Sequence, residues 1–285
     1  MSDKIKILKR LREETALGMA ECKNALEEVN YSYDKAITVL REKGKDIANK
    51  KLGRSTGQGV VGVKASKTGV SVIELCCETD FVSRGDSFCE IANKILSVAL
   101  ESKANSPEEL LKANNGTVKE LITSAIAKLG ENIKLQKTIY KQVTSGIIYY
   151  VHNAIQGHQD LGQIISVILY NSNNTEEAKE IMRLVAMHTA AANPSYVGIS
   201  DVPKNVIAEE KRIYSEQAKT SNKPATVVQK IIEGRLNKYY QENVLMEQNF
   251  VVDPDLKISQ AVQKVAKEKS CDILIKDFIL IKLVS

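Results

Sequence analysis

Apolar residues recur at helical spacing in three short stretches within the first fifty positions, with polar residues between them. Residues three or four apart lie on one face of a helix, so this pattern predicts three short helices that pack into a bundle within residues 1–54. Gly44 is the expected end of the third helix. The basic stretch from Arg41 to Arg54 is of a kind that sometimes binds phosphate, but we interpret it as a solvated linker. The apolar positions are Ile5, Leu8 and Leu11, then Met19, Cys22, Ala25, Leu26 and Val29, then Ala36, Ile37, Val39 and Leu40.

Beyond residue 55, runs rich in β-branched residues alternate with helical patterns. Residues 57–63 and 70–75 are two such runs, and the polar stretch between them predicts a β-hairpin. Together with the helices and the strand that follow, they form one α+β unit over 55–140. The later predicted elements of this unit are helices over 88–99, 107–113 and 117–129 and a strand that reaches about Tyr140.

A similar order of elements recurs and predicts an internal duplication of the α+β unit. The second unit comprises 141–202 and 244–285, and its helix carries His188, which we interpret as a structural residue. Its predicted elements are paired strands at 146–152 and 162–170, a helix through Ile181, Leu184, Val185 and His188, and a last strand over 277–283.

Two charged helices interrupt the second unit over residues 203–243. Their apolar positions suit a narrow seam and predict an antiparallel coiled-coil hairpin, with Lys223 and Pro224 at its turn. The seam positions are Val206, Ile207, Ile213, Val227, Val228, Ile231, Ile232 and Leu236.

A polar turn follows the strand at 70–75 and carries Asp80 and Phe81 side by side. In one interpretation, Phe81 and Val82 close a hydrophobic core while Asp80 caps the next helix. In the other, Asp80 and Phe81 form an exposed tip at the end of the strand. The residue pattern by itself favours the first interpretation.

The tetrapeptide Thr79-Asp80-Phe81-Val82 resembles the signature of bacterial and organellar elongation factor Ts. This resemblance implies an α+β fold with an N-terminal three-helix bundle of the ubiquitin-associated type and two duplicated α+β subdomains of antiparallel sheets with helices. The second subdomain would carry the inserted coiled-coil hairpin. The resemblance covers the whole chain, and its further blocks are Leu11-Arg12, Gly18-Met19, Cys22-Lys23, Ala25-Leu26, Leu129–Leu135 and Met246–Val251.

The same resemblance implies a guanine-nucleotide exchange factor and not an enzyme. The partner would be elongation factor Tu, bound in its GDP-bound and nucleotide-free forms during translation elongation. By resemblance, Phe81 wedges between side chains on the helix that follows the second switch of this GTPase. The Mg²⁺ ion then loses the support of its waters and GDP is released. Asp80 makes polar contacts beside Phe81, while Thr79 and Val82 hold the turn.

Other contacts are implied where residues match the docking surface of the family's first module. Arg12, Met19, Ala20 and Lys23 match positions that hold the nucleotide-binding domain of elongation factor Tu. Ala20 departs from the family, because many relatives have a second methionine there, so we expect a weaker grip. From spacing alone, Met19 would instead be assigned to the core.

His152 matches a contact with the third domain of elongation factor Tu, within a Tyr-x-His pattern. A lone histidine on an apolar strand is more often a satisfied structural residue, and the stretch after His152 departs from the family. Some relatives carry a further carboxy-terminal helix that packs on the nucleotide-binding domain. This sequence stops at Ser285, straight after a predicted strand, so we expect that contact to be missing.

Composition narrows the remaining choices. Five cysteines without ligand spacing predict neither a disulfide framework nor a metal site and suit a reducing cytoplasm, and we expect no cofactor. A signal peptide, a membrane-spanning run and the motifs of common enzymes are not recognisable. The net charge of +5 and the lack of Trp argue against direct nucleic-acid binding. The alternative to an exchange factor is a translation-associated basic binding protein whose helical bundle holds a ribosomal or peptide partner.

Overall fold

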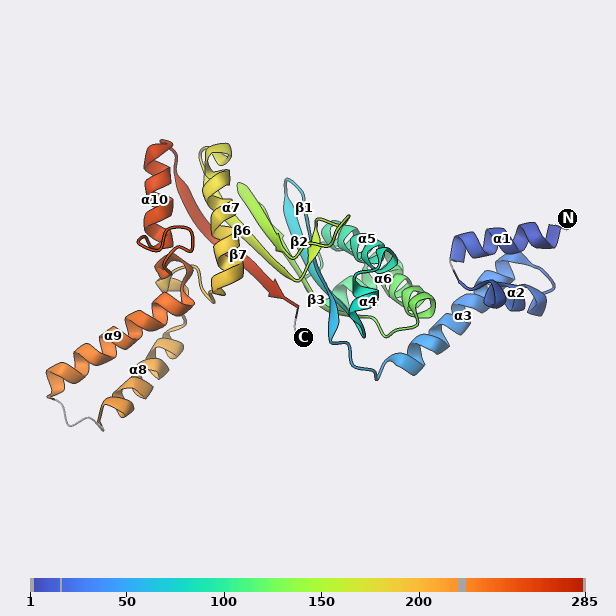
Figure 1. The fold of residues 1–285 in the computed structure, drawn as a ribbon, viewed down its shortest axis with the longest axis horizontal. Coiled ribbons are helices and arrows are strands. Elements are labelled where there is room, and N and C mark those ends of the chain that lie inside the picture. Colours follow the sequence, from blue (N-terminus) through green and yellow to red (C-terminus); the bar gives the residue numbers. More distant parts are fainter. Residues whose placement is uncertain (1–2, 16, 220–223, 284–285) are drawn as a thin grey trace. The chain divides into compact units, whose positions relative to one another are not determined.

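The computed structural model describes residues 3–15, 17–219 and 224–283 (Figure 1). Helices and antiparallel strand pairs together make an α+β fold, which confirms the predicted class. The chain divides into two compact units. The first contains the residues up to Gln142, Asn153–Gln163 and the chain end from Lys282, and the second contains Val143–His152 and Ile164–Ile281.

Three helices form at the amino terminus, as the apolar spacing predicted. They are α1 (Asp3–Thr15), α2 (Met19–Glu28) and α3 (Tyr33–Lys51). Their shared core consists of Leu11, Cys22, Ala25, Leu26, Ala36 and Leu40. The likeness of this bundle to ubiquitin-associated modules stays a prediction.

The third helix does not end at Gly44, so that prediction was wrong. Helix α3 continues to Lys51, and both Gly44 and Ala48 are buried within it. A Cβ atom placed on Gly44 would lie 3.6 Å from the Cβ of Ala127, which belongs to α6 (Pro107–Leu129). This distance is an ordinary van der Waals contact, so Gly44 lies where α3 packs against α6, and the packing carries α3 through a residue whose intrinsic helix penalty is about 1 kcal/mol. Most of the presumed linker is thus a helix packed within the first unit.

The first unit contains a four-stranded sheet in the order β3-β2-β1-β5. The predicted hairpin is confirmed, because β1 (Gln58–Ala65) pairs antiparallel with β2 (Gly69–Cys77). Strand β3 (Lys134–Gln142) pairs with the other edge of β2, and the short β5 (Leu161–Gly162) pairs with β1. Helices α5 (Asp86–Ser102) and α6 pack on this sheet, and α6 is broken at Ala113–Gly116, between its two predicted helices. The core includes Leu75, Phe88, Ala92, Ile95 and Leu96.

The second unit has a three-stranded sheet in the order β4-β6-β7. Strands β4 (Gly146–His152) and β6 (Ile164–Ser172) pair antiparallel, as predicted, and the last strand β7 (Ile273–Lys282) begins earlier than residue 277. Helices α7 (Thr175–Ala192) and α10 (Ile258–Glu268) contribute to its core. Strand β2 lies between β1 and β3 in the first sheet, and β6 lies between β4 and β7 in the second. The duplication of the two units stays a prediction.

A tyrosine ring covers a glycine in each sheet. A Cβ atom on Gly69 would overlap the ring of Tyr140, and one on Gly146 would overlap the ring of Tyr170. Tyr170 is buried, whereas Tyr140 is half-buried. As the rings stand, only a hydrogen side chain leaves room for them, and the buried Tyr170 has less freedom to move aside than the half-buried Tyr140.

The insertion in the second unit consists of α8 (Lys204–Lys219) and α9 (Ala225–Asn243), which pack against each other (Figure 1). Short 3₁₀ turns, Ile199–Asp201 and Leu245–Glu247, flank the pair. Coiled-coil geometry stays a prediction, and Lys223 of the predicted turn lies outside the described residues. The seam positions Val206, Ile207, Ile213, Val228, Ile231 and Ile232 are half-buried, Leu236 is buried and Val227 is exposed.

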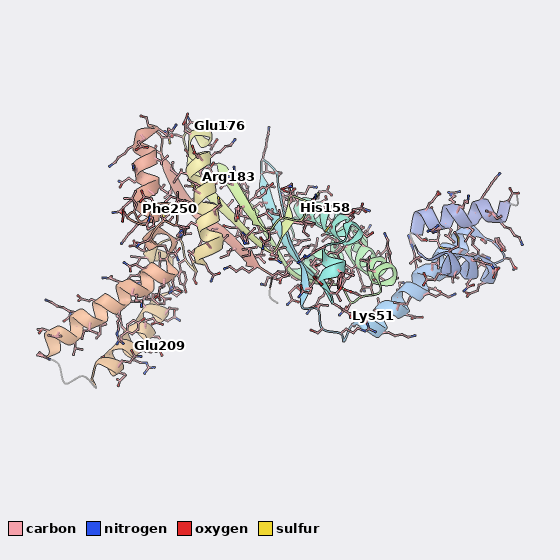
Figure 2. All side chains as sticks on the ribbon, viewed as in Figure 1. Lys51, His158, Glu176, Arg183, Glu209 and Phe250 are labelled. Atoms are coloured by element: carbon pink, nitrogen blue, oxygen red, sulfur yellow. The ribbon has the colours of Figure 1, made fainter. Side chains whose placement is uncertain are left out.

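His188 and Gln248 form a buried polar pair near the end of this insertion. The ring Nε2 of His188 lies 2.9 Å from Gln248 Oε1, and the backbone N–H of Val251 donates to Nδ1 at 3.2 Å. Because Nδ1 accepts, Nε2 carries the proton and donates to Gln248. Burial lowers the pKa of His188 below its usual value, against a smaller opposing effect of Gln248. His188 therefore has the structural role that was predicted, and its ring centroid lies 6.0 Å from that of Phe250. Phe250 is labelled in Figure 2.

Candidate functional site

A single helical turn, α4 (Asp80–Ser83), follows strand β2 and presents Phe81 to solvent. Thr79 is its N-cap, and the Thr79 hydroxyl accepts the backbone N–H of Val82 at 3.4 Å. Phe81 is 87% exposed, which makes it the most exposed large hydrophobic residue in the described part of the chain. Val82 packs against the core of the first unit. The interpretation in which Phe81 and Val82 close the core and Asp80 is the cap was therefore right for Val82 but wrong for Phe81, which is exposed, and for Asp80, since Thr79 caps α4.

The backbone at the start of this tip is held by the carboxylate of Glu131, which lies in the turn between α6 and β3. Its Oε2 accepts the backbone N–H groups of Glu78 and Thr79, both at 3.0 Å. Its Oε1 accepts the hydroxyl of Thr79 at 2.6 Å. Gly130 ends α6 with φ +74°, in the left-handed region that glycine adopts without strain, and so turns the chain into Glu131. Three hydrogen bonds to one ionised group form a strong anchor.

A second set of bonds links the same turn to the end of α3. The backbone N–H of Asn132 donates to Glu78 Oε1 at 2.6 Å, and the Asn132 side chain donates to the carbonyl of Arg54 at 2.8 Å. The hydrogen bond from Asn132, with the nearby charge of Arg54, holds the pKa of Glu78 below its usual value. Lys51, labelled in Figure 2, donates to the carbonyl of Gly130. The base of the tip, the α6–β3 turn and the end of α3 are thus bonded together.

Two buried thiols bond to the backbone on either side of α4. Cys77 Sγ donates to the carbonyl of Thr79 at 3.2 Å, and Cys89 Sγ donates to the carbonyl of Ser83 at 3.6 Å. Burial raises the pKa of Cys77 to about 12 and that of Cys89 to about 11, so both stay protonated donors at neutral pH. Within the described ranges, no group of three or more His, Cys, Asp or Glu is placed to hold a metal ion. None of the helices described is long and apolar enough to cross a membrane.

The predicted docking residues of the first module all lie at its surface. Met19 is 44% exposed, so it is not a core residue, and Ala20 and Lys23 are exposed on the same helix. Met19 and Lys23 are four positions apart and therefore share one face of α2, which borders its buried stripe of Cys22, Ala25 and Leu26. Lys23 also pairs with Glu27 at 3.7 Å. Arg12 is exposed in the last turn of α1.

His152 is the last residue of β4, in the second unit, and it is exposed. Its Nδ1 lies 3.0 Å from the hydroxyl of Tyr150, and the two rings are tilted toward each other with centroids 6.0 Å apart. It is not a buried structural histidine. The site residues therefore fall into three groups: the tip, the surface of the first helices and the end of β4.

Comparison with known proteins decides the family. A family model described as Elongation factor TS matches residues 78–284. The chain belongs to the elongation factor Ts family. Curated relatives named Elongation factor Ts include that of Clostridium botulinum, which is 41% identical over 96% of this chain and 90% of the relative. Those of Rhodospirillum rubrum and Brucella anthropi are 37% and 38% identical over 97% and 99% of this chain, and over 91% and 93% of the relatives.

The role of Glu131 as the anchor of the tip was missed in the sequence. Glu131 stood within the matching block Leu129–Leu135 but was assigned no role of its own. Its partners lie 52 and 53 positions earlier in the chain, and no local pattern signals a bond over that separation. Both Thr79–Val82 and Leu129–Leu135 match the elongation factor Ts family. That match alone does not reveal that the two blocks are in contact.

Proposed function

We propose that this chain is the nucleotide exchange factor of elongation factor Tu, and that it releases GDP by inserting Phe81 beside the nucleotide site. Membership of the elongation factor Ts family supports the general function in translation elongation. The proposed insertion rests on one observation: Phe81 is exposed on a turn whose backbone is held by hydrogen bonds. A large apolar side chain that is exposed to water is a candidate for burial in a partner.

Exchange involves no covalent change. The chain and GDP bind elongation factor Tu with negative coupling, and linkage requires each of them to weaken the other by the same factor. If GDP binds with about nanomolar affinity and an association rate constant near ~10⁶ M⁻¹s⁻¹, unassisted release runs at roughly 10⁻³ s⁻¹. Translation adds ~5 to 20 residues per second, so the exchange factor must accelerate release by roughly three to four decades.

Phe81 supplies part of this acceleration by wedging between side chains on the helix after the second switch. Bound GDP is held by the phosphate loop and by Mg²⁺, whose water ligands depend on surrounding side chains. Displacing that helix removes the support, while the Asp80 carboxylate makes polar contacts beside the wedge. Thr79 and Val82 hold the backbone below Phe81, since one caps α4 and the other packs on the core.

Separate surfaces hold the partner while the tip acts. The exposed side chains of Arg12, Met19 and Lys23 dock on the nucleotide-binding domain, and Ala20 adds little apolar area there. His152, exposed at the end of β4, contacts the third domain. The activity belongs to a reducing cytoplasm, as the five cysteines are all free and buried.

The deciding experiment is release of fluorescent GDP from elongation factor Tu at saturating concentrations of the chain. Phe81→Ala is expected to slow stimulated release about thirtyfold, because a buried aromatic anchor is typically worth ~2 kcal/mol. Phe81→Tyr should be milder, and excess Mg²⁺ should oppose the wild-type chain. Val252→Ala is the matched control, since Val252 is 58% exposed but lies in the second unit.

Saturation matters because docking no longer limits the rate there and only the insertion is tested. Release by Phe81→Ala at the wild-type rate under these conditions would overturn the wedge. A loss of folded structure by circular dichroism in that variant would instead show that Phe81 has a structural role in solution.

A further inference from the structure

We propose that Glu131 is a positioning residue for nucleotide exchange, which acts by fixing the backbone from which Phe81 projects. This inference rests on the proposed function of the tip. Glu131 does not belong to the Thr79–Val82 tetrapeptide and lies 52 positions beyond Thr79. Its effect on the partner is transmitted through Thr79 and α4.

The geometry shows how one carboxylate controls the helical turn. Both oxygens of Glu131 are used by the tip, Oε2 by two backbone N–H groups and Oε1 by the Thr79 hydroxyl. That hydroxyl in turn accepts the N–H of Val82, so the chain of bonds runs from Glu131 through Thr79 to Val82. Phe81 lies between the two bonded residues. Loss of the carboxylate therefore releases the N-cap and the entry into α4 at the same time.

The anchor itself is fixed from the other side. Asn132, the next residue, is buried, and its side chain donates to the carbonyl of Arg54 at 2.8 Å. Its backbone N–H donates to Glu78 Oε1, while the backbone N–H of Glu78 donates to Glu131 Oε2. Two hydrogen bonds of opposite direction therefore join Glu78 to residues 131 and 132. The carboxylate of Glu131 therefore stands on a turn that has little freedom to follow a displaced tip.

Glu131→Gln is the sharpest variant because it keeps the shape of the side chain. Its amide offers one oxygen and one NH₂ group, so it cannot accept on both sides as the carboxylate does. An NH₂ group at Oε2 would face two N–H donors, and one at Oε1 would face the Thr79 hydroxyl, which could then no longer donate to residue 131. The maximal rate of GDP release at saturation is expected to fall about tenfold, equivalent to about 1.4 kcal/mol. The concentration that gives half-maximal stimulation should change less than about threefold, because the docking surfaces are untouched.

Three further variants complete the test. Glu120→Gln removes an exposed carboxylate on α6 that has no bond to the tip and should behave as wild type. Thr79→Ser keeps the hydroxyl that links Glu131 to Val82 and should retain most of the rate, whereas Thr79→Val should lose it. Thermal unfolding of each variant, followed by circular dichroism, shows whether the chain remains folded.

A double-mutant cycle separates positioning from a merely structural role. If Glu131 acts through Phe81, then Glu131→Gln should change the rate less than about twofold when Phe81→Ala is already present. An equal loss in both backgrounds would overturn the proposal, as would a wild-type rate for Glu131→Gln alone. If Phe81→Ala is slow while Glu131→Gln is fast, the proposed function stands and the positioning role fails. If Phe81→Ala is itself fast, both fail together.

Discussion

The two α+β units pass from their central strand to the next helix in different ways. In the first unit, Glu78 and Thr79 follow β2, and the turn of α4 presents Phe81 before α5 begins. In the second unit, Asn173 and Asn174 follow β6, and Asn174 caps α7 directly, with its side chain accepting the N–H of Glu177 at 3.4 Å. Each of these two connections joins an inner strand to the next long helix, but only the first one carries an exposed aromatic residue, Phe81.

Both connections are nevertheless bonded to the residues that precede the last strand of their unit. Glu78 and Thr79 bond to Glu131 and Asn132, before β3. Asn173 accepts the backbone N–H of Asp272, just before β7, at 2.8 Å. Both units thus have this attachment, while the turn of α4 and the carboxylate of Glu131 distinguish the first connection, and we propose that exchange depends on these two features.

The largest expected effect comes from giving the first connection the polar character of the second. Asp80→Asn combined with Phe81→Ser removes both the wedge and the carboxylate beside it. Stimulated GDP release at saturation should fall about a hundredfold, equivalent to about 2.7 kcal/mol. The reverse change, Asn173→Asp with Asn174→Phe, should not raise the rate. If the double variant of the tip released GDP at a rate within about threefold of wild type, the difference between the two connections would not matter for exchange.

The glycines beneath the tyrosine rings are expected to differ in the free energy of unfolding. Gly146→Val forces a side chain against Tyr170, which is buried and whose hydroxyl donates to the Thr175 carbonyl, so overpacking should cost about 2 kcal/mol. Gly69→Val meets the half-buried Tyr140, whose ring can move outward, and should cost less than about 1 kcal/mol. Denaturant unfolding followed by circular dichroism measures both. Equal costs would show that the two rings are equally free to move.

Acid should weaken the second unit through His188. The pKa of this buried ring is lowered from 6.5 in the folded chain, so the unfolded chain takes up a proton first as the pH falls. The stabilising contribution is complete above about pH 6.5 and is lost progressively below it, by at most ~1.4 kcal/mol per pH unit for one group. The test is to measure the free energy of unfolding of wild type and of His188→Gln by denaturant between about pH 7.5 and about pH 5.5, on either side of roughly 6.5. In His188→Gln the free energy of unfolding should fall less steeply as the pH is lowered. If it falls as steeply as in wild type, the pH dependence comes from other groups.

The smallest effect is expected at the counterpart of the Glu131 anchor. Asn173→Ala removes one exposed hydrogen bond to the backbone of Asp272 and should cost about 0.5 to 1 kcal/mol of stability. GDP release should stay at the wild-type rate, in contrast to Glu131→Gln. Thermal unfolding and the release assay measure the two outcomes, and slower release in Asn173→Ala would mean that the second connection also takes part in exchange.

Much of the fold followed from periodicity, because the predicted hairpin, the broken helix over 107–129 and the pairing of 146–152 with 162–170 all depend on local patterns. Gly44 was misjudged because α3 continues through it and packs against α6, a contact with residues far away in the sequence that no local pattern reveals. The exposure of Phe81 was also out of reach of local pattern, since Phe81 and Val82 are both apolar and only the packing of α4 decides which one is buried. The resemblance to the family pointed to the tetrapeptide Thr79–Val82. The hydrogen bonds by which Glu131 holds it became visible only in the structure.

The bonds at residues 78–83 also affect the entropy of association. Fixing the backbone of a free loop costs about 1–2 kcal/mol per residue, so ordering six residues on contact would consume ~6 to 12 kcal/mol. Here the turn is already formed before any partner arrives, and a phenylalanine has only two side-chain torsions left to restrict. Contact therefore need not wait for a loop to fold, and association can proceed at the ~10⁵–10⁷ M⁻¹s⁻¹ of pre-formed protein surfaces.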